Sequence, residues 1–118
     1  PIDRDHMDYL RSIGDDNFIA SMVEGFLEDV ADCRISLNKS VETRDPALFR
    51  FAAHAFKSSA NNIGAKQLAA LCAKLEKVTE ADFDAERAEY LRRIENELQR
   101  ATHALQTGQR DKSVKAAR

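Results

Sequence analysis

Apolar residues recur at every third or fourth position through most of this chain, which is the spacing of amphipathic helices. No stretch alternates apolar and polar residues with the two-residue period of a β-strand. Breaks are rare, because the 118 residues include only four glycines and two prolines. The pattern therefore predicts an all-α protein, and the length fits one domain.

Five helices follow from this spacing and from the residues that start and stop them. The predicted ranges are about 3–13, 16–44, 45–64, 65–78 and 82–107. The strongest signals bound the third helix, where Asp45 and Pro46 form a typical start and Gly64 a typical end. The caps expected elsewhere are Asp3 for the first helix, Asp16 or Asn17 for the second, and Asp82 or Asp84 for the fifth.

Four long helices with short connections pack as antiparallel neighbours. We therefore expect an antiparallel up-down four-helix bundle, with the short first helix covering one end. The residues expected to face its core are Met7 and Leu10 in the first helix, then Phe18, Met22, Phe26, Val30, Cys33, Leu37, Val41, Phe49, Ala52, Phe56, Ser59, Ala60, Ile63, Leu68, Leu71, Cys72, Leu75, Val78, Leu91, Ile94, Leu98, Ala101 and Leu105. The domain is assigned to residues 1–108, and residues 109–118 are expected to form a basic, flexible C-terminal tail.

Charge and composition argue against several functions. Lys and Arg number 18 and Asp and Glu number 20, so the chain lacks the basic surface of a nucleic-acid-binding protein. No apolar run approaches the roughly 18 residues that a membrane span needs. We expect a cytoplasmic protein without nucleic-acid or direct membrane contact. The missing initiator Met is expected for a fragment or a processed chain, and a longer parent protein could be anchored in the inner membrane.

Cysteine, histidine and glutamate show no arrangement typical of a metal site. Cys33 and Cys72 follow no ligand spacing and are expected to be buried, reduced thiols. His6 and His103 have no ligand partner three or four residues away, so both are expected on the surface. The glutamates expected mostly on solvated helix faces are Glu76, Glu80, Glu86, Glu89, Glu95 and Glu97.

The third predicted helix places a histidine on its outer side. The residues that face away from the core, each within about 60° of His54 at 100° per residue, are Ala47, Arg50, His54 itself, Lys57, Ser58 and Asn61. Phe51 lies on the border of this face. The short side chains around His54 would let the cleft of another protein reach the imidazole. Geometry alone leaves open an idle surface histidine.

Arg50 and Lys57 lie one turn to either side of His54. They would favour the neutral, nucleophilic imidazole and later balance the charge of an attached phosphoryl group. A unit pair at ~4 Å is worth about 1 kcal/mol in water and about 4 kcal/mol at an effective dielectric near 20, below the ~8 kcal/mol or more of enzyme catalysis. Neither a carboxylate set for Mg²⁺ nor a glycine-rich phosphate loop is present nearby. We expect no cofactor and no metal, so a partner must supply the catalytic groups if His54 is a nucleophile.

The stretch AHAFKSSANNIGA resembles the signature of histidine-containing phosphotransfer (HPt) domains, which reads roughly H-x-hydrophobic-K-G/S-S/A-x-x-x-hydrophobic-G-A. The matching residues are His54, Phe56, Lys57, Ser58, Ser59, Ile63, Gly64 and Ala65. Ser58 stands where many members have glycine. The later stretch LAALCAKLE resembles the next helix of that family. The five-helix layout is also similar, so the resemblance covers about residues 5–107.

The resemblance implies that His54 accepts a phosphoryl group from a receiver-domain aspartyl phosphate and passes it to a response regulator. It implies that Lys57 stabilises the phosphoryl oxygens and that Mg²⁺ belongs to the receiver domain only. We expect no autonomous kinase or hydrolase activity. Many members are the C-terminal module of a bacterial hybrid sensor histidine kinase.

The partners implied are receiver domains of a hybrid kinase or response regulator. The residues expected to contact them are Ala47, Arg50, Phe51, Ser58 and Asn61. As an isolated domain the chain is expected to be monomeric. The alternative hypothesis is a helical docking module that binds a partner enzyme or receiver without being phosphorylated.

Overall fold

The computed structural model describes residues 2–14 and 16–116, with side chains described for residues 2–12, 14 and 16–106. Its helices are α1 (Arg4–Ile13), α2 (Asp16–Glu42), α3 (Pro46–Ile63), α4 (Lys66–Leu75) and α5 (Glu80–Ala116). Within this described part no β-strand is present, so the prediction of an all-α fold is confirmed.

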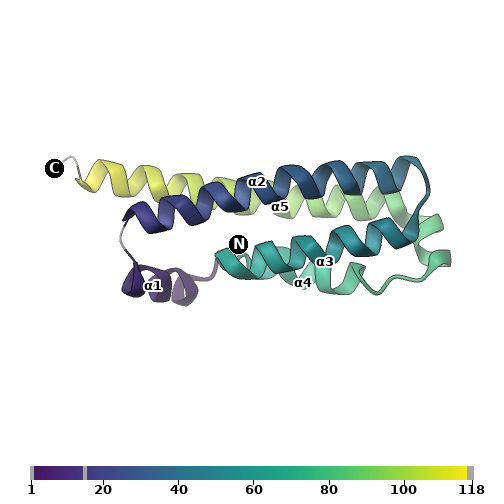
Figure 1. The fold of residues 1–118 in the computed structure, drawn as a ribbon, viewed down its shortest axis with the longest axis horizontal. Coiled ribbons are helices and arrows are strands. Elements are labelled where there is room, and N and C mark those ends of the chain that lie inside the picture. Colours follow the sequence, from purple (N-terminus) through teal and green to yellow (C-terminus); the bar gives the residue numbers. More distant parts are fainter. Residues whose placement is uncertain (1, 15, 117–118) are drawn as a thin grey trace.

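The helices form the predicted up-down bundle (Figure 1). Each of α3, α4 and α5 reverses the direction of the helix before it, and α2 packs on α3, α3 on α4, α4 on α5 and α5 on α2. The short α1 covers the end of the bundle where α2 begins and α3 ends. Within the described residues no helix is long and apolar enough to cross a membrane.

Both predicted end signals of α3 are present. The Asp45 side chain accepts a hydrogen bond from the backbone N–H of Leu48 at 3.1 Å, and Pro46 opens the helix. Gly64 ends the helix in the left-handed region, with φ of 82°. Its carbonyl accepts the N–H of Asp3 at 2.7 Å, which ties the start of α1 to the end of α3. These two ends determine which side chains of α3 face the core and which face outward.

The inner face of α2 differs from the prediction at both ends of the helix. Ile19, Val23 and Ser40 are buried, whereas Phe18 is exposed and Met22 and Val41 are half-buried. Successive steps of four residues advance about 40° beyond one full turn, so they drift away from the core. Ile19 lies seven residues before the buried Phe26, within about 20° of it, and therefore replaces Phe18.

The connection between α4 and α5 lies earlier in the chain than predicted. α4 ends at Leu75, and α5 begins at Glu80 because the Thr79 hydroxyl accepts the N–H of Asp82 at 3.1 Å. Phe83, which is missing from the predicted core, is fully buried, and its ring lies 5.1 Å from that of Phe49. An apolar residue one turn into a helix is therefore part of the core.

At its other end α5 continues to Ala116, so the predicted end near residue 107 is too early. The predicted tail of residues 109–118 begins inside this helix, and its last two residues and all of its side chains lie outside the described part.

Both cysteines are buried free thiols, as predicted. Burial raises the pKa of the Cys72 thiol to about 12, so it stays protonated at neutral pH.

Replacing Phe49 by Ala should lower the free energy of unfolding by about 3–5 kcal/mol, because the ring is fully buried and leaves a cavity. Phe51→Ala is the matched control, since Phe51 is 71% exposed and its loss should change stability by no more than about 0.5 kcal/mol. Urea unfolding followed by circular dichroism measures both. Equal losses in the two variants would contradict the burial described for α3.

Candidate functional site

The outer face of α3 presents His54 to solvent, as predicted. The His54 side chain is 64% exposed, and Ala47, Ser58 and Asn61 are also exposed. The Ser58 hydroxyl donates to the backbone carbonyl of His54 at 3.3 Å, which keeps this short side chain against its own helix. Phe51, predicted at the border of this face, exposes an aromatic ring one turn before His54. The imidazole is therefore open to another molecule.

The opposite side of α3 is buried over a wider arc than predicted. Ala53, next to His54 in sequence, is fully buried, whereas Ser59 is only half-buried and donates to Asp29 at 3.3 Å. The buried arc includes Ala53 and largely omits Ser59 because α3 packs against two neighbours, α2 and α4. Ala53 thus serves close helix packing, whereas Ala47, Ser58 and Asn61 remain on the exposed face.

Glu76, directly after α4, joins His54 and Lys57. Its Oε2 lies 2.7 Å from His54 Nδ1, and its Oε1 accepts a hydrogen bond from Lys57 Nζ at 2.5 Å. The Glu76 side chain is only 14% exposed. Because each carboxylate oxygen has its own partner, Glu76 fixes both side chains of α3 at once.

The expectation that Glu76 marks a solvated helix face is wrong. Glu76 lies four residues after the buried Cys72 and eight after the buried Leu68. It therefore continues the apolar stripe of α4, where a carboxylate needs a partner. That register was the signal in the sequence that could have identified it.

Neither of the two cations one turn from His54 contacts the imidazole. Arg50 donates to the backbone carbonyl of Val78 at 3.3 Å, which ties α3 to the segment between α4 and α5. Lys57 is half-buried and directed at Glu76. The charged group that contacts the imidazole is therefore a carboxylate, and neither cation pairs with the ring.

Electrostatics keep Glu76 ionised. The hydrogen bond from Lys57, and next the one from His54, hold the pKa of the Glu76 carboxyl below its ordinary value of 4.5. An ionised carboxylate can only accept hydrogen bonds, so both Lys57 Nζ and His54 Nδ1 are donors here.

The remaining histidines lie away from this site. His6 is half-buried rather than on the surface, because its Nε2 hydrogen-bonds with the Asn62 carbonyl at 3.0 Å. His103 is exposed on α5, as predicted. Among the described residues, no three His, Cys, Asp or Glu side chains form a group that could hold a metal ion.

Comparisons with known proteins agree with this architecture. A family model described as "Hpt domain" matches residues 21–108, well over half of the chain. A solved structure that is similar is the crystal structure of histidine-containing phosphotransfer protein B (HptB) from Pseudomonas aeruginosa PAO1. It is 21% identical, with a TM-score of 0.82 over 93% of this chain and 95% of that one, and this likeness shows the fold. The comparison with curated proteins found no match.

The lowered pKa of Glu76 predicts how stability responds to acid. The contribution of the Glu76 carboxylate should be complete above pH 4.5 and disappear as the pH falls through its lower folded-state pKa. The free energies of unfolding of parent and Glu76→Gln should therefore differ most near pH 7 and converge below pH 4.5. Urea unfolding across this range measures the difference, with the exposed Glu86→Gln as control. A difference that grows in acid would contradict the assigned ion pair.

Proposed function

The chain belongs to the Hpt domain family, and on that basis we propose that it is a phosphocarrier in a two-component phosphorelay. His54 accepts a phosphoryl group from the aspartyl phosphate of a receiver domain and passes it to a response regulator. The observation that carries this proposal is the exposed imidazole of His54, with Lys57 one turn away and Glu76 against Nδ1.

Nε2 is the nitrogen that reacts in this proposal, because Glu76 contacts Nδ1. The lone pair of Nε2 forms a bond to phosphorus, and the bond between phosphorus and the aspartate oxygen breaks. The electron pair of that bond returns to the aspartate carboxylate. The second transfer runs in the opposite direction, from Nε2 to the aspartate of the next receiver.

The receiver supplies the Mg²⁺ and the other groups that stabilise the transferring phosphoryl, and this chain supplies the nucleophile and one cation. A positioned cation and a bound Mg²⁺ together neutralise charge that develops on the phosphoryl oxygens. The proposed chain is therefore a substrate and carrier, without kinase or hydrolase activity of its own.

Receivers dock on the outer face of α3 in this proposal. The exposed ring of Phe51 provides an apolar contact next to His54. The side chains of Ala47, Ser58 and Asn61 are short, so they leave room for the receiver to reach the imidazole. Arg50 contributes through its half-buried guanidinium at the edge of this face. We place the domain in the cytoplasm, as a monomer, where receiver domains are available to it.

His54→Gln should abolish labelling by a phosphorylated receiver domain, because no other imidazole occupies this site. The parent should acquire an acid-labile, base-stable phosphoryl group, measured by radiolabel transfer. His103→Gln, an exposed histidine on α5, is the control and should label like the parent. Binding of the receiver without any labelling of the parent would favour the docking module instead.

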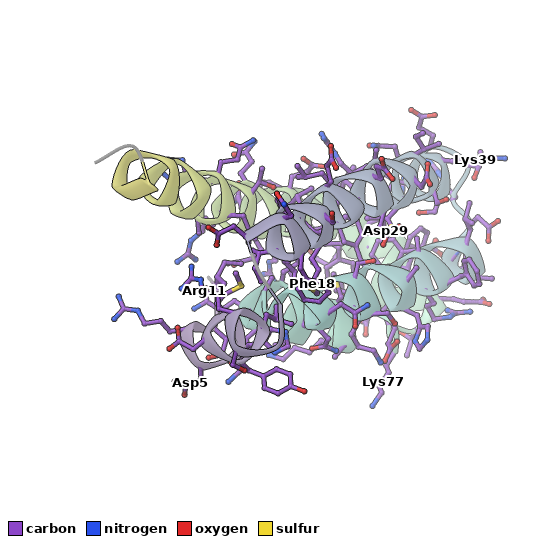
Figure 2. The ribbon with its side chains drawn as sticks, turned by 60° about the vertical axis from the view of Figure 1, so that its left-hand side comes forward. Asp5, Arg11, Phe18, Asp29, Lys39 and Lys77 are labelled. Carbon is purple, nitrogen blue, oxygen red and sulfur yellow. The ribbon has the colours of Figure 1, made fainter. Side chains whose placement is uncertain are left out.

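Lys57→Ala should shorten the lifetime of the phosphohistidine and slow transfer by about tenfold, or ~1.4 kcal/mol, within the range for a cation near an anion at a protein surface. The domain should remain folded. Lys39→Ala is a charge-matched control, because Figure 2 shows Lys39 near the end of α2 that lies away from α1. Equal phosphoryl lifetimes in Lys57→Ala and the parent would contradict this role.

A further inference from the structure

We infer that a hollow between α2 and α3, beside Gly25 and Asp29, receives a lysine or arginine side chain of the receiver domain. This inference rests on the proposed phosphocarrier function and names the kind of receiver that the docking face fits. Such a receiver carries a basic side chain at the edge of its own docking surface. Gly25 and Asp29 then determine specificity without touching the reacting atoms.

The hollow is a space of about 170 Å³ between two neighbouring helices of the bundle. Phe26 and Ile63, which are both buried, form its apolar floor. The half-buried Met22 of α2 and the exposed Asn62 of α3 border it on opposite sides. Sites for small molecules have volumes of roughly 300 Å³ or more, so this smaller space suits one long side chain.

Gly25 keeps the hollow open, although the fold does not need a glycine there. Gly25 lies inside α2, and a Cβ atom at this position would meet nothing within 4 Å beyond its own turn of helix. Alanine would therefore fit, and it would favour the helix, because glycine in a helix interior is destabilising relative to alanine. At Gly64, by contrast, a left-handed φ and the close approach of His6 require glycine. Packing gives no such reason for Gly25, whereas a side chain there would take up space that a partner can use.

The rim of the hollow is acidic. Asp29 lies where α2 borders α3 (Figure 2), and its Oδ2 accepts a hydrogen bond from the Ser59 hydroxyl at 3.3 Å, so Oδ1 can accept from another donor. Glu28 and Asp32 are exposed on the same helix. Among the side chains that the structure describes, no Lys, Arg or His forms an ion pair with these three carboxylates. Charge complementarity therefore favours a cationic occupant over an anionic one.

The hollow continues the docking face proposed around His54. Phe51, Ala55, Ser58 and Asn62 lie within about 60° of one another on α3, since steps of three or four residues make about one turn. Phe51 and Ser58 belong to the proposed docking face, and Asn62 borders the hollow. Asn62 is eight residues from His54, or about 12 Å along the helix axis. A protein partner covers roughly 800 Å², a disc of about 16 Å radius, so a receiver seated on His54 and Phe51 extends to the hollow.

A lysine or arginine side chain matches both parts of this site. Its methylene stem would lie on the apolar floor, in the space that Gly25 leaves, and its charged end would reach Asp29 at the rim. Charges at the edge of an interface act mainly on the rate of encounter and on the rejection of wrong partners. A receiver with an acidic residue at the matching position would be repelled by Asp29. The site thus selects among receivers without changing the chemistry at His54.

The first experiment measures labelling by a phosphorylated receiver domain that labels the parent, at several receiver concentrations. Gly25→Leu fills the hollow and should lower the second-order rate constant of transfer about tenfold, as for loss of a central interface contact. Gly25→Ala should raise the urea midpoint of unfolding and label at a rate between those of the parent and Gly25→Leu. Ala88→Leu adds the same side chain at an exposed position of α5 and should label like the parent. A parental rate constant in Gly25→Leu would overturn the inference.

The second experiment tests the charge of the occupant. Asp29→Asn keeps an acceptor for Ser59 but removes the charge, and it should lower the same rate constant about threefold at low salt. Added salt should slow the parent more than Asp29→Asn, because salt screens the attraction. Glu86→Gln removes an exposed charge on α5 and should behave like the parent. An Asp29→Asn variant with the parental rate and salt dependence would show that the assigned basic side chain is wrong, even if Gly25→Leu is slow.

The position of the receiver can be measured without any transfer. Addition of the unphosphorylated receiver domain should shift the backbone amide NMR signals of Gly25 and Ser59 together with that of Phe51. A shift at Phe51 without one at Gly25 and Ser59 would place the hollow outside the interface and refute its role.

Phosphoramidate distinguishes failure of this inference from failure of the phosphocarrier function. In this small donor the phosphorus–nitrogen bond breaks and ammonia leaves as His54 Nε2 bonds to phosphorus. No docking face is needed, so Gly25→Leu and Asp29→Asn should label like the parent with it. A parent that neither phosphoramidate nor the phosphorylated receiver labels would refute the phosphocarrier function. A parent that both label, with variants that keep its rate with the receiver, would refute only the role of the hollow.

Discussion

Packing of α3 against both α2 and α4 determines the rest of this structure. The rings of Phe49 and Phe56 are fully buried, and Asp45 and Gly64 close the two ends of the helix. With both ends and one side fixed, the helix cannot rotate about its axis. A shift of one residue would rotate it by about 100° and expose these rings to water. The outward direction of His54 is therefore a by-product of core burial.

The functional site also depends on where α4 stops. Glu76 follows directly after Leu75, the last residue of α4, and only at this point does its carboxylate reach two side chains of α3. The sequence predicted a longer α4 with Glu76 inside the helix. In the structure Glu76 is instead the C-cap of α4, from which the chain turns toward α5. The site is thus shared between the middle of one helix and the end of the next.

Features that depend on residues close together in the sequence were predicted correctly, whereas features that depend on contacts between distant residues were not. The ends of α3 were correct because Asp45, Pro46 and Gly64 act within one turn. The register of His54 followed from those ends. The partner of His54 could not be predicted in the same way, since Glu76 lies 22 residues away and their contact depends on how two helices pack. Phe18 was misplaced because a stripe of apolar residues drifts around a helix of 27 residues.

The exposure of His54 affects how long a phosphoryl group could remain on its ring. Because 64% of this side chain is open, a phosphoryl group on Nε2 would be reached by water as easily as by another protein. No part of the protein would shield this phosphohistidine from water, so it would be hydrolysed over time whenever no receiver is bound. The time for which the signal survives is then set by the strength of the nitrogen–phosphorus bond and by how soon the next receiver covers the site.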